Sequence, residues 1–180
     1  MSKINKHVIW GSVAALLLTG VFVSVLSFPL HSVAAQSGNG TIASGAGTTI
    51  IQGGTGSPSF VPVKTTIAFH AERSGADVTG DLECLAFAPA VATGPGSGQF
   101  TVNAMYVSGQ ITGAVVAGDT ATLTGISHIT GLGAGSSVPF ELVIRGGGPG
   151  ATAVLTTKGS PTLTFHEILT EGSFQVSSDQ

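Results

Sequence analysis

Three histidines, His70, His128 and His166, carry the most specific chemistry in the chain, because imidazole is a common ligand for zinc, copper and nickel. Each lies in a stretch of alternating apolar and polar residues, at the parity of the polar side. That parity predicts an outward position on a sheet. No His-x-His pair followed by Glu places two ligands on one strand face. The sequence therefore favours exposed strand histidines and predicts no cofactor, with a metal site at these three residues as the alternative.

A pair of carboxylates, Asp81 and Glu83, is the second candidate for chemistry. The two residues are two apart on one predicted strand, so their side chains face the same way. Glycosidases need two carboxyl groups roughly 5–10 Å apart, which this pair meets loosely. Because no aromatic sugar-binding residues lie nearby, the pattern favours a solvated strand whose charges discourage aggregation.

Two further patterns resemble catalytic motifs without meeting their structural requirements. His166-Glu167 begins a near match to the zinc-protease helix motif, but Thr170 stands where the second histidine belongs. Residues 146–151 spell Gly-x-Gly-x-x-Ala, yet they join two predicted strands, whereas a dinucleotide-binding loop opens a helix. The chain also lacks the Gly-x-Ser-x-Gly elbow of serine hydrolases. We therefore expect a protein that is not an enzyme.

Cys84 is the single cysteine, so the chain cannot form an internal disulfide and depends on packing for stability. It lies inside a predicted strand, where the simplest interpretation is a small buried apolar side chain. An intermolecular disulfide and a reactive thiol are the alternatives. No positively charged neighbour in the sequence supports the reactive thiol.

The elements that must position these residues are short alternating stretches separated by turn residues. Residues 63–72 show the clearest alternation. Residues 99–132 are predicted to be the sheet nucleus, with an outward row of threonines and a core made by Phe100, Val102, Tyr106, Leu123 and Ile129. Eight to ten short strands with frequent turns indicate an all-β fold, either an antiparallel β-sandwich or a partly closed barrel.

Four segments are predicted along the chain. Residues 1–35 have the layout of a signal peptide with a leader helix, because Lys3 and Lys6 precede a long uncharged run that ends in small residues. That run is long enough for an uncleaved membrane anchor to stay open. Residues 36–60, rich in Gly, Ser and Thr, are predicted to be a flexible spacer, with a short edge strand at residues 48–52 left open. Residues 61–177 form one β-domain, followed by a disordered tail at residues 178–180.

The order of motifs over residues 61–177 resembles the small secreted bacterial β-domains of the post-COAP type. The motifs are Ile67-Ala68-Phe69-His70-Ala71, Thr79-Gly80-Asp81-Leu82, Tyr106-Val107-Ser108-Gly109, and residues 118–125, 138–140 and 172–176. The resemblance implies a β-fold and an exported compartment. It implies no catalytic residue, since such domains are mostly of unknown function.

Charge narrows the choice of partners. After residue 35 the chain has four basic residues against nine acidic ones, a balance of −5, which argues against nucleic acid and anionic lipid. We expect an exported, non-catalytic structural or binding module of the bacterial cell envelope or extracellular space, with an unknown protein or surface ligand as partner. Self-association through an edge strand stays open. The alternative is a secreted metal-binding protein or hydrolase that uses the surface His and Asp/Glu residues.

Overall fold

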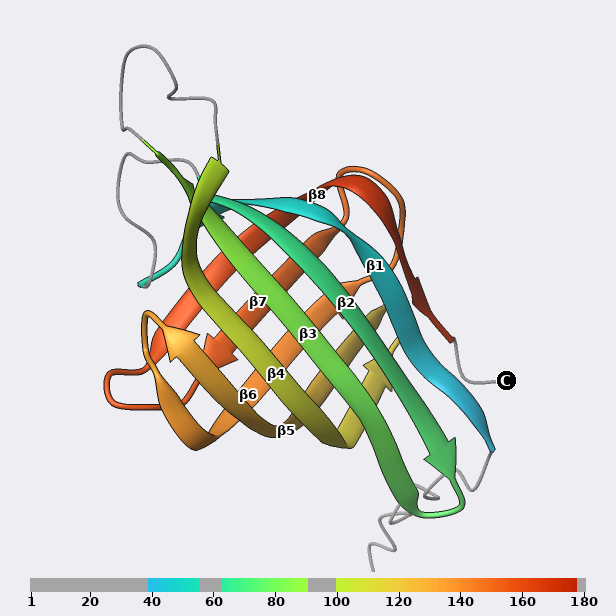
Figure 1. Ribbon diagram of the computed structural model, residues 1–180. Helices are drawn as coiled ribbons and strands as arrows, with labels where there is room; N and C mark the ends of the chain where they lie inside the picture. Colours follow the sequence, from blue (N-terminus) through green and yellow to red (C-terminus); the bar gives the residue numbers. More distant parts are fainter. Residues whose placement is uncertain (1–38, 56–62, 91–99, 178–180) are drawn as a thin grey trace, which may run out of the picture. The chain divides into compact units, whose positions relative to one another are not determined.

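Eight strands form a closed antiparallel barrel in the computed structural model, which describes residues 39–55, 63–90 and 100–177 (Figure 1). Each strand pairs with its neighbour in sequence, and the last strand pairs with the first. No helix long and apolar enough to cross a membrane is found in these residues. The strands are β1 (Gly40–Gly53), β2 (Val63–Ser74), β3 (Asp77–Pro89), β4 (Phe100–Ala117), β5 (Thr120–Gly131), β6 (Gly135–Arg145), β7 (Thr152–Thr157) and β8 (Leu163–Val176).

The all-β antiparallel prediction is confirmed, and the architecture is a fully closed barrel rather than a sandwich. The strands are longer than expected, since β4 alone has 18 residues. Ser108 and Gly109 lie within β4, and the register shift of β4 against β5 falls later, between Ile111 and Gly113. Gly109 has a packing role, because a Cβ there would lie only 2.8 Å from the ring of Phe140.

Period-two alternation separates the inner from the outer surface of the barrel. In β2 every odd position from 63 to 71 is buried and every even position from 64 to 72 is exposed. Leu123 and Ile129 of β5 face the core as predicted, with threonines on the outward side. Each large apolar side chain buried in this way contributes about 1.5–3 kcal/mol.

The inward face of β4 is the opposite of the one predicted. Met105 and Val107 are buried, whereas Val102 is 47% exposed and Tyr106 is only partly buried on the outer face. The side chain of Phe100 lies outside the described part of the structure. Both faces of this strand carry apolar residues, so alternation alone does not select one, and a one-residue slip exchanges them. Pairing with the buried positions of β3 and β5 decides which face turns inward.

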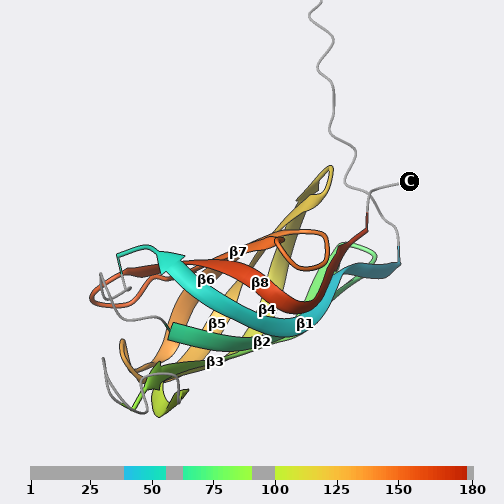
Figure 2. The same cartoon turned by 90° about the horizontal axis from the view of Figure 1, so that it is seen from above.

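The predicted flexible spacer is wrong over Gly40–Gly53, which form β1 between β2 and β8 (Figure 2). Its glycines serve close packing. A Cβ on Gly47 would lie 2.2 Å from the carbonyl oxygen of Glu171 on β8. A glycine-rich composition predicts flexibility only when no neighbouring strand packs into the space that the missing side chains leave. Here both neighbouring strands do.

Closure of the barrel also bears on two other predictions. Residues 48–52 lie inside β1 and are paired on both sides, so they are not an edge strand. Every one of the eight described strands has two hydrogen-bonded neighbours, and none offers the free edge that self-association would use.

The β-domain begins at β1 rather than near residue 61. The predicted leader, residues 1–35, and the tail, residues 178–180, lie outside the described residues.

The two ends of the barrel are filled differently. Because successive strands alternate in direction, β1 begins and β8 ends at the same end as the β2–β3 hairpin (Figure 1). At that end the rings of Phe69 and Phe174 pack with centroids 5.4 Å apart. The opposite end is where β1 and β3 finish and where β2 and β8 begin.

Candidate functional site

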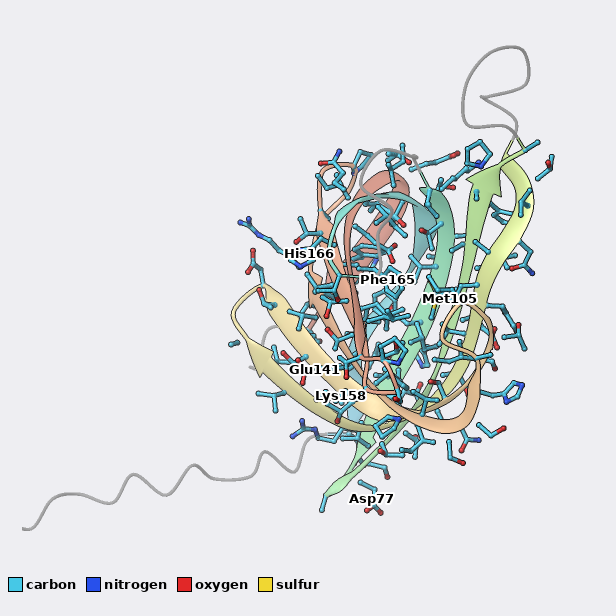
Figure 3. All side chains as sticks on the ribbon, turned by 90° about the vertical axis from the view of Figure 1, so that its left-hand side faces the viewer. Asp77, Met105, Glu141, Lys158, Phe165 and His166 are labelled. Atoms are coloured by element: carbon cyan, nitrogen blue, oxygen red, sulfur yellow. The ribbon has the colours of Figure 1, made fainter. Side chains whose placement is uncertain are left out.

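Among the residues that the structure describes, Glu167 on β8 is the one charged residue buried inside the barrel. Its side chain is 2% exposed, in a core that is otherwise almost entirely apolar. Phe165 and Leu169, two residues to either side, are also buried, while His166 between them is exposed. Figure 3 shows Phe165 between the facing walls of the barrel. The alternation of β8 therefore holds the carboxylate inside.

Two threonines from adjacent strands face this carboxylate. Thr49 on β1 and Thr65 on β2 are opposite one another in register, and both are fully buried. The hydroxyl of Thr49 donates a hydrogen bond to Oε2 of Glu167. The hydroxyl of Thr65 lies close enough to favour the ionised carboxylate. However, its oxygen makes no hydrogen bond of normal geometry to any described atom.

Burial controls the electrostatics of this cluster. It raises the pKa of Glu167 from 4.5 to about 7, against the smaller lowering effect of the two threonines. It also raises the pKa of Cys84 on β3 well above its usual value, with a further contribution from the negative charge of Glu167. At neutral pH the carboxyl group can therefore take up or release a proton, and it can accept a hydrogen bond or pair with a cation.

A cavity of about 100 Å³ lies beside this cluster, at the end of the barrel where β1 and β3 finish. Its lining comes from residues near the ends of strands around much of the barrel, and it includes Met105, which Figure 3 labels on β4. Apart from Glu167, Thr65 and Cys84, the described part of the lining is apolar. The lining residues are Ile51, Val63, Thr65, Cys84, Ala86, Ala88, Ala104, Met105, Leu132, Leu155, Phe165 and Glu167.

The structure does not bring the three candidate histidines together. His70 and His166 both flank β1, but they stand opposite Ser44 and Gly53, which at about 3.3 Å per residue lie roughly 30 Å apart along the strand. His128 is on β5, paired with β4 and β6. Among the described residues no group of three or more His, Cys, Asp or Glu side chains is placed to hold a metal ion.

The individual surroundings of the histidines are those of surface residues. Nε2 of His70 lies 2.8 Å from Oε1 of Glu72, with both side chains about half exposed. Nδ1 of His128 lies 3.4 Å from the hydroxyl of Ser136. The His166-Glu167 pair lies on a strand, so the resemblance to a zinc-protease helix has no structural counterpart.

The two candidate carboxylates face outward together, as predicted. Asp81 and Glu83 are both exposed on β3, and Glu83 accepts a hydrogen bond of 2.9 Å from Ser108. Asp81 lies opposite His70 in a shallow polar groove of about 420 Å³ on the outer surface. The groove contains a second carboxylate, that of Glu72. This carboxylate contacts the ring of His70 and does not lie opposite Asp81.

Sequence reasoning missed the buried cluster. The alternation of inward and outward residues could have indicated it. Glu167 falls on the same face as Phe165 and Leu169, and Thr65 falls on the same face as the buried Val63 and Ile67. A charged residue at an inward position of a strand is the more informative observation, since charged side chains are rarely buried without a partner.

Comparison of the chain with protein-family models, curated proteins and solved structures finds no match. The resemblance to the post-COAP type stays a prediction. The function of the chain must therefore be inferred from its fold and its buried cluster.

Proposed function

We propose that this chain is a non-catalytic binding module whose barrel holds a small apolar molecule at the end where Glu167 lies. The observation that carries the proposal is the apolar cavity of about 100 Å³ inside that end. The ends of β-barrels are common positions for ligand sites, and such sites combine an apolar lining with a few polar groups. Glu167 and Thr65 are those polar groups here.

The size of the cavity limits what it holds. An apolar cavity of about 150 Å³ engineered into another protein takes up benzene. The volume here is smaller, about 100 Å³, so it suits a short branched chain, and a single ring needs part of the space toward Leu132 as well. A larger ligand would extend outward past Leu132, which lines the cavity and is 47% exposed.

Thermal unfolding in the presence of toluene tests this proposal. Toluene at ten times its dissociation constant should stabilise the barrel by about 1.4 kcal/mol and raise Tm by about 3–6 °C. Ala86→Leu fills part of the cavity and should remove most of that increase. Ala68→Leu on the outer face of β2 is the matched control and should keep it. An unchanged Tm in the native chain, or an equal increase in Ala86→Leu, would contradict the proposal.

We also propose that the module acts outside the cytoplasmic membrane, in the cell envelope or the extracellular space. Support comes from the leader-like residues 1–35. N-terminal sequencing of the chain recovered from the medium and from the membrane tests this. A mature chain that begins at Gln36 is the expected result, and a full-length chain found only in the cytoplasm would oppose it.

A further inference from the structure

The buried cluster indicates the chemical class of the ligand. We infer that the occupant of the cavity carries a primary ammonium group, held by Glu167 and Thr65, on an alkyl or aryl body that packs against the apolar lining. This inference rests on the proposed binding function and deepens it.

The site has unused hydrogen-bonding capacity. A carboxylate has room for about four hydrogen bonds, so the one from Thr49 leaves acceptor positions open on Glu167. The hydroxyl oxygen of Thr65 is fully buried and lines the cavity, and although it lies near Glu167 it makes no hydrogen bond of normal geometry to a described residue. Buried polar atoms are rarely left unpaired in folded proteins, so an unpaired one facing a cavity marks a place for a ligand. An ammonium group donates three hydrogen bonds and matches these acceptors.

The negative charge of Glu167 also favours a cationic ligand. The part of the cavity lining that the structure describes contains no Lys, Arg or His to compensate Glu167. Burial accordingly raises the pKa of this carboxyl group to about 7. A positive group within about 4–6 Å favours the ionised carboxylate and reverses that effect. A carboxylate ligand would be repelled, and a hydroxyl ligand would form hydrogen bonds without supplying the missing charge.

The remaining lining of the cavity suits an alkyl or aryl body. Phe165, Met105 and Leu155 present apolar surface beside the polar cluster. A ligand with a single polar group therefore has one orientation that satisfies both parts of the site. Molecules with several polar groups would leave some of them unpaired against apolar walls.

Binding of three compounds of similar size tests the inference by titration calorimetry at pH 8. The compounds are benzylamine, benzyl alcohol and toluene. We expect benzylamine to bind at least tenfold more tightly than benzyl alcohol. Glu167→Gln removes the charge with little change in shape and should abolish this preference. His166→Gln, at the adjacent outward position of β8, is the matched control and should retain it.

A milder variant covers the case in which Glu167→Gln does not fold. Thr65→Val replaces the unpaired hydroxyl with a methyl group of similar shape. It should lower the affinity for benzylamine severalfold and leave the affinity for toluene unchanged.

The native chain alone provides another readout. Affinity for benzylamine should fall about tenfold from pH 8 to pH 6, as Glu167 becomes protonated around its pKa of about 7. Cys84 is the other titratable group described in the lining, and it stays protonated throughout because burial raises the pKa of its thiol. Affinity for toluene should not decrease over the same range.

The outcomes separate the two proposals. Equal binding of benzylamine, benzyl alcohol and toluene would overturn the ammonium inference and leave the apolar binding function in place. Unchanged benzylamine affinity in Glu167→Gln or between pH 6 and pH 8 would overturn it as well. Failure of all three compounds to bind would overturn both proposals.

Discussion

Glu167 is a buried acid without a described cation beside it, and this arrangement has a cost to folding. Transfer of an ionised carboxylate out of water is expensive, and one hydrogen bond from Thr49 compensates only part of it. Proteins reduce this cost by holding such groups partly protonated, which is what a pKa of about 7 means at neutral pH. The ligand-free barrel should therefore be less stable than its core alone would make it.

The pH dependence of stability follows from this group. The pKa of Glu167 is about 7 in the folded chain against an ordinary value of 4.5. The folded state therefore binds the proton more tightly, and the associated stability is complete below pH 4.5, declines from pH 4.5 to 7, and is lost above pH 7. The difference corresponds to about 3 kcal/mol. Urea unfolding at pH 5 and pH 8 should show this decline in the native chain.

Two variants assign the decline to Glu167. Glu167→Gln cannot ionise and should be nearly as stable at pH 8 as at pH 5, apart from the effects of exposed groups. His166→Gln should behave like the native chain, because its side chain faces solvent. A decline that persists undiminished in Glu167→Gln would assign it to another group.

Cys84 should be chemically inert in the folded barrel. Its side chain is 5% exposed and its thiol is free. Burial raises the pKa of the thiol, so the reactive thiolate is scarce at neutral pH. We expect labelling by a disulfide reagent to be at least a hundredfold slower in native buffer than in denaturant. Rapid labelling of the native chain would show that this end of the barrel opens often.

At the scale of the strands, the glycines of β1 should be intolerant of a side chain where they contact β8. Gly47→Ala places a Cβ 2.2 Å from a backbone oxygen of Glu171 and 2.5 Å from a methyl group of Leu169. The backbone must move to relieve this overlap, at a cost of about 1–3 kcal/mol. Gly53→Ala, in the same strand, meets nothing within 4 Å and should be close to neutral. Chemical denaturation of both variants measures the difference.

The strands also show what could be predicted from the sequence. In β2 burial alternates from Val63 to Glu72, and only Thr65 and Ala68 depart from the polarity of their face, so both the strand and its inward face could be predicted. In β4 apolar residues occupy both faces, and only the pairing with β3 and β5 selects the inward one. The sequence of β1 resembles a spacer because it is rich in glycine. The composition does not reveal that residues of the neighbouring strands pack against those glycines.

The candidate site was partly accessible by the same reasoning. The outward positions of His70, His128 and His166 follow from strand parity and are observed. The inward position of Glu167 could have been predicted from the same parity, although it was not. The sequence does not show which residues surround Glu167. Thr49, for example, lies 118 residues away in the chain and contacts Glu167 only because the barrel closes.

For the molecule as a whole, closure by β1 joins the site to the stability of the barrel. β1 supplies Thr49 and Ile51 to the cluster and the cavity, and it also completes the pairing of β2 and β8. Ligand binding at this end should therefore stabilise the β1–β8 seam, because a molecule that binds only the folded state raises its stability by mass action.

Removal of β1 provides the strongest test of closure. A chain that begins at Gly54 would leave β2 and β8 unpaired along the edges that now bind β1. Long free edges of this kind promote association between chains, so we expect aggregation in size-exclusion chromatography and loss of the near-ultraviolet circular dichroism of packed aromatic rings. A chain that begins at Asn39 keeps all eight strands and is the control. If the chain from Gly54 were instead a stable monomer, residues 40–53 would act as the spacer that their composition suggests, and the cluster at Glu167 would not need Thr49.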